Sequence, residues 1–167
     1  MNILRVFVVL CLMGFVAGCI PSKGLIYDTN YDYDIDTDFS KLKRYNWLPI
    51  PVTTKLDPLN AKRIVATADT LLKARGLVKT QNQPDFLIEL TTGVLKKMDT
   101  TGGPTEYGIY EEGRLKLNFI DANAKEIIWK GETRVRLQPN LKPDEKDKLI
   151  YDAVVKVLMN FPPPPAG

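Results

Sequence analysis

The chain is 167 residues long, carries 23 Lys and Arg against 20 Asp and Glu, and has two cysteines and no histidine. The lack of histidine excludes imidazole acid–base catalysis, a Ser-His-Asp triad, a Cys-His dyad and imidazole metal sites. The net charge of +3 comes from acidic and basic residues that are intermixed along the chain. Because nucleic-acid binding needs a clustered basic face, we expect no nucleic-acid partner.

The first 18 residues have the organisation of a secretory signal peptide. Arg5 precedes an uncharged stretch, Val6 to Val16, which is shorter than the roughly 20 apolar residues of a membrane-spanning helix. The tetrapeptide Val16-Ala17-Gly18-Cys19 then resembles the lipobox of bacterial lipoproteins. The resemblance implies cleavage between Gly18 and Cys19 and acylation of Cys19, for example with palmitate. The alternative is an ordinary secretory signal in which the cysteine occurs by chance.

Two or three acyl chains on Cys19 would anchor the mature protein stably without spanning the membrane. Ile20 stands where an aspartate would favour the inner membrane, so we expect the periplasmic face of the outer membrane, with the lipid bilayer as a partner. Cys11 would leave with the signal peptide, and no thiol would remain for a disulfide. We therefore expect a lipid-anchored tether over residues 19–25, a single domain over 26–161 and a proline-rich tail over 162–167.

The mature chain opens on a strict alternation of aromatic or branched residues with aspartates. The period of two predicts a half-buried strand over Tyr31–Phe39, with four aspartates on its solvated face: Asp32, Asp34, Asp36 and Asp38. An EF-hand loop that started at Asp32 would have Thr37 in place of the invariant glycine and Lys43 in place of the bidentate glutamate. We therefore predict no metal site, and we expect these carboxylates to pair with Lys or Arg of a neighbouring strand.

Two amphipathic helices are predicted from their caps and apolar periodicity. In the first, Asp57 suits the N-cap and Pro58 the first helical position, and an apolar stripe continues until Gly76. The second helix begins near Pro143, carries an apolar stripe as far as Phe161 and is ended by the prolines from Pro162 onwards.

Three further strands are predicted between the helices. Asp85 to Val94 reads as a strand, Asp99 to Gly108 as a loop, and the segments 115–119 and 129–137 as a hairpin with one apolar and one charged face. The order of elements predicts an α+β fold, a two-layer sandwich of a mainly antiparallel sheet of about four strands with two helices on one face.

Several short motifs resemble the bacterial lipoproteins built on the domain of unknown function 4136. The motifs are Tyr33-Asp34-Ile35-Asp36-Thr37-Asp38-Phe39-Ser40, Tyr45-Asn46-Trp47, Asp85-Phe86-Leu87-Ile88, Gly113-Arg114-Leu115, Asp121 leading to Ile128-Trp129-Lys130-Gly131, and Phe161-Pro162-Pro163. The resemblance covers roughly Ile26 to Pro163 and implies an envelope lipoprotein of uncharacterised role. It supplies no catalytic residues.

The candidate partner-binding residues lie in two places. Tyr107 and Tyr110 belong to the long Gly- and Thr-rich loop Thr100–Tyr110, and Arg134 and Arg136 lie on the charged side of the last predicted strand. Trp47 and Trp129 each lie in an apolar pattern, which favours packing over ligand stacking. Glu111 and Glu112 are adjacent and would face opposite sides of a strand, so they cannot act together on one substrate.

These observations favour a non-catalytic binding or support module of the envelope, with a protein or glycan partner, no cofactor and no catalytic residue. The alternative is a glycan hydrolase that uses carboxylates only, which would need two of them converging in a concave pocket. A third hypothesis, a carrier of a soluble ligand, would need a large apolar cavity between the sheet and the helices.

Overall fold

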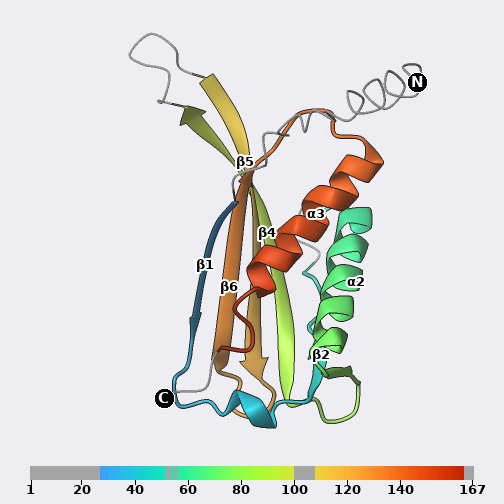
Figure 1. Ribbon diagram of the computed structural model, residues 1–167, viewed down its shortest axis with the longest axis vertical. Helices are drawn as coiled ribbons and strands as arrows, with labels where there is room; N and C mark the ends of the chain where they lie inside the picture. The colour runs from blue at the N-terminus through green and yellow to red at the C-terminus, as the bar shows by residue number, and fades with distance from the viewer. Residues whose placement is uncertain (1–26, 52–53, 55, 100–107, 164–167) are drawn as a thin grey trace, which may run out of the picture.

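The computed structural model describes residues 27–51, 54, 56–99 and 108–163. These residues form a six-stranded sheet with two helices against one of its faces (Figure 1). The elements in chain order are β1 (Tyr27–Tyr33), a 3-10 helix (Phe39–Lys41), β2 (Arg44–Trp47), α2 (Pro58–Ala74), β3 (Val78–Lys79), β4 (Phe86–Asp99), β5 (Gly108–Asp121), β6 (Ile127–Arg136) and α3 (Pro143–Leu158). Among the described residues, none of the helices has the length and apolar character needed to cross a membrane.

The predicted α+β class is confirmed, but the sheet is larger and more mixed than expected. Its strand order is β1-β6-β5-β4-β2-β3. Strands β1, β6, β5 and β4 pair antiparallel, whereas β2 pairs parallel with both β4 and β3. Strands β2 and β3, of 4 and 2 residues, were not predicted. Segments this short cannot display a recognisable period.

The prediction of a strand over Tyr31–Phe39 is wrong in its position. The strand ends at Tyr33, which pairs with Trp129 near the beginning of β6. Beyond it, Asp34 accepts hydrogen bonds from the Asp36 amide and the Thr37 hydroxyl, which close a turn. Asp38 caps the 3-10 helix through the Ser40 amide. Asp34 and Asp38 thus serve local turns, for which Asp is well suited, rather than one face of a strand.

Both helices occur where they were predicted because their termini are marked by local chemistry. The Asp57 side chain accepts the Asn60 amide at the N-cap of α2, and Gly76 follows the helix with a φ of +83°. At α3, the Glu145 side chain accepts the Lys142 amide and Pro143 opens the first turn. Helix α3 ends at Leu158, so Phe161 lies just beyond it, although it is buried as expected.

An aromatic cluster fills one end of the space between sheet and helices. Phe161 contacts the rings of Phe119 and Trp129, with centroids 4.4 and 5.3 Å apart, and Phe86 stacks on Phe119 at 5.1 Å. Trp129 is fully buried, as predicted. We call this the closed end of the sandwich.

At the opposite end, β4 and β5 extend past the helices as a two-stranded hairpin (Figure 1). We call residues 93–99 and 108–113 the arm. Strand β4 therefore continues beyond Val94, its predicted end, as far as Asp99. Val94, Leu95, Met98 and Ile109 of the arm are exposed. This end of the sandwich, which we call the open end, therefore presents apolar side chains to solvent.

Candidate functional site

The outer face of the sheet, opposite the helices, carries an ordered lattice of charges. Its central members come from the even-numbered positions of β5 and β6, with contributions from β1 and β4. The ion pairs are Lys130–Asp32 at 2.9 Å, Arg134–Glu132 at 2.5 Å, Arg114–Glu132 at 3.4 Å, Arg134–Asp28 at 3.7 Å, Lys97–Glu112 at 2.8 Å and Arg136–Asp99 at 2.7 Å. Both cations and carboxylates are thereby held in place on a single surface.

Three of the four candidate partner-binding residues lie on this outer face. The Arg136 guanidinium stacks 4.4 Å from the centroid of the Tyr110 ring and donates to Asp99. The Arg134 Nε donates to Glu132 at 2.6 Å. Tyr107, as well as Gly18 and Cys19 of the predicted cleavage and acylation site, lies outside the described residues. Tyr110 of the predicted loop thus lies on the same surface as Arg134 and Arg136 of the charged strand.

Hydrogen bonds and neighbouring charges on the outer face stabilise the ionised forms of Asp32 and Arg134. The hydrogen bond and charge of Lys130 lower the pKa of Asp32. Hydrogen bonding to Glu132 and the charge of that carboxylate raise the pKa of Arg134. The expected pairing of the aspartate series with neighbouring basic residues is therefore confirmed for Asp32, the one member of the series that lies in a strand.

The other aspartates of that series do not assemble a cation site. The Thr37 hydroxyl lowers the pKa of Asp34, and the Ser40 hydroxyl lowers that of Asp38, so both carboxylates serve local turns. Within the described residues, no group of three or more Asp, Glu, Cys or His could hold a metal ion.

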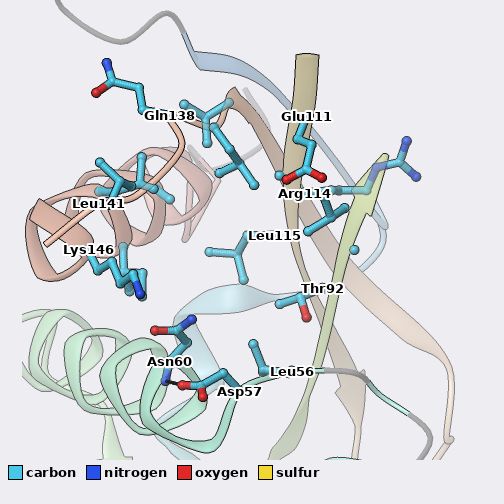
Figure 2. Close-up of a pocket in the computed structure, with 18 of the residues that line it drawn as sticks. Leu56, Asp57, Asn60, Thr92, Glu111, Arg114, Leu115, Gln138, Leu141 and Lys146 are labelled. Atoms are coloured by element: carbon cyan, nitrogen blue, oxygen red, sulfur yellow. Dashed lines mark hydrogen bonds between the residues drawn. The ribbon is translucent and has the colours of Figure 1, made fainter. Parts of the chain in front are cut away.

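A cleft of about 690 Å³ opens at the other face of the sheet, between its inner side and the N-terminal parts of both helices (Figure 2). Its walls are mainly apolar side chains from α2, β4, β5, β6, α3 and the segments before the two helices: Leu56, Ile64, Val94, Leu115, Val135, Leu137, Leu141, Leu149, Ile150 and Ala153. This volume falls within the range of about 300–1,000 Å³ that is usual for small-molecule sites. The sequence patterns placed most of these residues on the apolar faces of helices and strands but did not indicate a cleft, and they made no prediction for Leu56 and Leu141.

Polar groups surround the cleft without converging at one point. Asp57 and Glu111 lie at opposite ends of it in Figure 2, and the Asp57 carboxylate accepts the Asn60 amide. Glu112, the neighbour of Glu111, pairs with Lys97 on the outer face, so the two glutamates face opposite sides as expected. Lys146 supplies a cation to the rim, whereas the Arg114 side chain belongs to the outer face, where it pairs with Glu132.

Side-chain size along the strands explains why the cleft exists. The inward positions of β5 run Phe119, Leu117, Leu115, Gly113, and those of β6 run Trp129, Gly131, Thr133, Val135. On β5 the inward side chains become smaller from Phe119 to Gly113, whereas on β6 only Trp129, at the closed end, is large. The strand register shows that the two aromatic side chains lie opposite each other at the closed end and that no aromatic side chain lies opposite Gly113.

The acidic residues of two sequence motifs have structural roles at the closed end. Asp85 accepts the amides of Lys43 and Arg44 at 2.8 Å and the Arg44 guanidinium at 2.9 Å. Partial burial opposes ionisation of Asp85, but these hydrogen bonds outweigh it and lower the pKa. Asp121 accepts the amides of Asn123 and Ala124 in the β5–β6 turn.

A family model described as a domain of unknown function, DUF4136, matches residues 29–163. The chain belongs to the DUF4136 family. The family membership that the sequence motifs indicated is thereby confirmed. No curated protein matches the chain significantly.

Solved structures share the fold of this DUF4136 chain at low sequence identity. A PDZ domain protein from Parabacteroides distasonis is 13% identical with a TM-score of 0.61, over 86% of this chain and 37% of that protein. A PelC dodecamer from Paraburkholderia phytofirmans is 10% identical with a TM-score of 0.52, over 80% of this chain and 95% of that one. The DUF4136 chain thus spans little more than a third of the first protein. At these identities the similarity concerns the fold alone.

Proposed function

We propose that this protein is a non-catalytic binding module of the bacterial cell envelope, anchored by acylated Cys19 at the periplasmic face of the outer membrane. Its partner is an envelope protein or glycan, which it contacts through the outer face of the sheet. The observation that carries the proposal is the ordered charge lattice, in which Arg134, Arg136 and Tyr110 are held by neighbours on a face opposite both described helices.

Such a surface favours binding because its charged groups are already positioned before a partner arrives. Arg side chains and aromatic rings contribute strongly to interfaces. Ion pairs on an exposed face contribute little to folding, so this lattice is free to exchange internal pairs for contacts with a partner. Complementary charge would then determine specificity and the rate of association.

The carboxylates of the described residues offer little support for the hydrolase alternative. A general acid of a glycosidase needs a raised pKa. The pKa values of Asp32, Asp34, Asp38 and Asp85 all lie below the ordinary aspartate value. In the cleft, Asp57 and Glu111 are far apart and Asp57 serves as a helix cap. Both observations favour binding over turnover.

The partner contact can be tested by crosslinking in intact envelopes. The double variant Arg134→Glu/Arg136→Glu should abolish crosslinks to the partner and leave the thermal midpoint close to that of the wild type. The matched control Lys62→Glu/Lys148→Glu reverses two charges on the helices and should keep the crosslinks. Equal crosslinking in both variants would show that the outer face is not the interface. Hydrolysis of peptidoglycan by the purified protein, lost on changing one carboxylate without unfolding, would establish the enzyme instead.

The anchor is tested separately. Cys19→Ser should move the protein out of the detergent phase, because two acyl chains are what makes such an anchor stable. Mass spectrometry of the wild-type mature protein should find acyl groups on Cys19. An unmodified first residue would refute the anchoring.

A further inference from the structure

A second pocket, of about 570 Å³, lies on the outer side of the closed end. It forms where the end of β1, the 3-10 helix and the C-terminal end of α2 meet, at the end of the molecule farthest from the arm (Figure 1). Two motifs of the sequence, over 33–40 and 161–163, provide most of the residues that line it. The proposed contact through the outer face of the sheet uses neither motif. The pocket therefore offers a separate role for both of them.

The wall of this pocket contains aromatic rings that hold one another in place. Tyr33 packs edge-on against Phe39, with ring centroids 6.0 Å apart, and Phe39 packs edge-on against Phe161 at 6.1 Å. Tyr33 and Phe39 are half-buried, so part of each ring remains accessible. Leu42 and Leu77 add aliphatic side chains to the wall. Because the rings are positioned before any ligand arrives, the pocket suits a molecule with an apolar or aromatic group.

Arg75 supplies the pocket with a cation that lacks a partner. It is the C-cap residue of α2 and lines the pocket. Within the part of the chain that the structure describes, its side chain forms no hydrogen bond or ion pair, whereas each of the other arginines pairs with an Asp or Glu: Arg44, Arg63, Arg114, Arg134 and Arg136. Burial lowers the pKa of Arg75, and no carboxylate opposes that effect. A partly desolvated guanidinium remains charged at neutral pH and favours an anion as its partner.

The other charged groups of the pocket limit which anion can bind. Lys43 adds a second cation, and Asp36 and Asp38 add two carboxylates. Asp38 is already engaged, since it accepts the amide and the hydroxyl of Ser40 and pairs with Lys41. The two cations and the two carboxylates balance, so the pocket has no excess positive charge for a phosphate monoester, which carries about −1.5 to −2 at pH 7. The balance of charge therefore favours a singly charged carboxylate.

We propose that this pocket binds a carboxylate that is attached to an apolar group, either in a small organic acid or at the C-terminal residue of a polypeptide. The carboxylate pairs with Arg75, whose planar guanidinium can donate two parallel hydrogen bonds to it. The apolar group packs on Tyr33 and Phe39, and its burial supplies further affinity. The site lies apart from the outer face of the sheet and requires no acylation of Cys19, so its test is independent of the proposed function.

Isothermal titration calorimetry tests the site with the full chain in non-ionic detergent micelles, against a blank of micelles alone. N-acetylphenylalanine should bind. Its amide, which lacks the charge, and acetate, which lacks the apolar group, should each bind at least about tenfold more weakly, because each loses one of the two contacts. Inorganic phosphate should also bind more weakly. If the amide, acetate or phosphate binds as tightly as N-acetylphenylalanine, the pocket is not a site for an apolar carboxylate.

Two substitutions at Arg75 locate the binding. Arg75→Gln should weaken the binding of N-acetylphenylalanine by at least about tenfold and keep the thermal midpoint close to that of the wild type. Arg75→Lys should retain part of the affinity, since it keeps the charge but not the bidentate geometry. The matched control is Lys73→Gln, which removes one positive charge from the last turn of the same helix, outside the pocket wall, and should bind like the wild type. Equal losses in Arg75→Gln and Lys73→Gln would overturn the proposal.

Peptides distinguish the two sources of the carboxylate. The probe is an acetylated peptide of four glycines and a C-terminal phenylalanine, compared with its C-terminal amide. If the peptide binds more tightly than N-acetylphenylalanine and amidation removes the binding, the ligand is the C-terminus of a polypeptide, whereas equal or weaker binding assigns a small organic acid. If the wild type binds neither probe, or Arg75→Gln binds them as tightly as the wild type, the proposal is wrong. Crosslinking through the outer face reports the proposed function separately.

Discussion

The closed and open ends of the sandwich are built on the same three long strands, yet their interiors differ. At the closed end, Trp129 and Phe119 fill the space under α3 completely. At the open end, the equivalent inward positions hold Gly113 and Val135, and a cleft remains. The pairing of Phe119 with Trp129 therefore gives a packed core at the closed end, whereas the open end, where Gly113 pairs with Val135, keeps a cleft on the same sheet. The following predictions test that difference.

The largest effect is expected at Trp129. Trp129→Ala removes a fully buried side chain from the aromatic cluster and should lower the free energy of unfolding by about 3–5 kcal/mol. Val135→Ala, at the wall of the cleft, should cost only about 1–2 kcal/mol. Denaturant melts measure both. Equal losses would mean that the open end is packed as tightly as the closed end.

The contribution of Asp85 to the free energy of unfolding should depend on pH. Its folded-state pKa is lowered, so its contribution is present above the ordinary aspartate pKa of about 3.9 and is lost as the pH falls through the folded value. Asp85→Asn should cost about 1.5–3 kcal/mol at neutral pH, as is usual for hydrogen bonds to a charged group. The difference in the free energy of unfolding between Asp85→Asn and the wild type should become smaller as the pH falls. Denaturant melts from pH 7 to pH 2 test this, and a difference that stays constant would contradict it.

Two glycines offer a matched comparison of close packing. A Cβ on Gly131 would lie 2.8 Å from the Val157 carbonyl oxygen of α3 and 2.4 Å from the Trp129 ring. Gly131→Ala should therefore push α3 from the sheet and cost about 1–3 kcal/mol. Gly93, at the base of the arm, has nothing within 4 Å of such a Cβ. Gly93→Ala should leave the midpoint unchanged, and a loss comparable to that of Gly131→Ala would reveal packing around the arm.

No effect is expected from removing metal ions. A chelator should leave the melting temperature unchanged, because Asp34 and Asp38 are engaged in local turns. If millimolar calcium stabilised the protein and Asp34→Asn/Asp36→Asn removed that effect, the turns at the closed end would be a cation site after all.

The sequence alone determined those features that depend on residues close together along the chain, namely the helix ends and the hairpin. The caps at Asp57 and Pro143, the helix end at Gly76 and the two-faced hairpin were all predictable, because capping and strand alternation act within a few residues. The inward position of Trp129 followed from parity alone. Short sequence motifs indicated membership of the DUF4136 family. In two of these motifs, Asp85 accepts the amide of Arg44 at the start of β2, and Asp121 accepts the amide of Asn123 in the β5–β6 turn.

Only the tertiary structure decided which alternating segments become strands and where the cavity lies. Tyr31 to Phe39 alternates throughout, but β1 ends at Tyr33, where its pairing with β6 ends and Asp34 forms a turn. Strand β2 pairs with the edge of β4, and β3 pairs with the edge of β2. Both short strands therefore depend on their neighbours in the sheet more than on a pattern in their own few residues. The cleft lies beside Gly113 and Val135, which pair across the β5–β6 hairpin, but its other walls come from β4, α2 and α3. How the two helices pack on these strands is a property of the tertiary structure that no local pattern encodes.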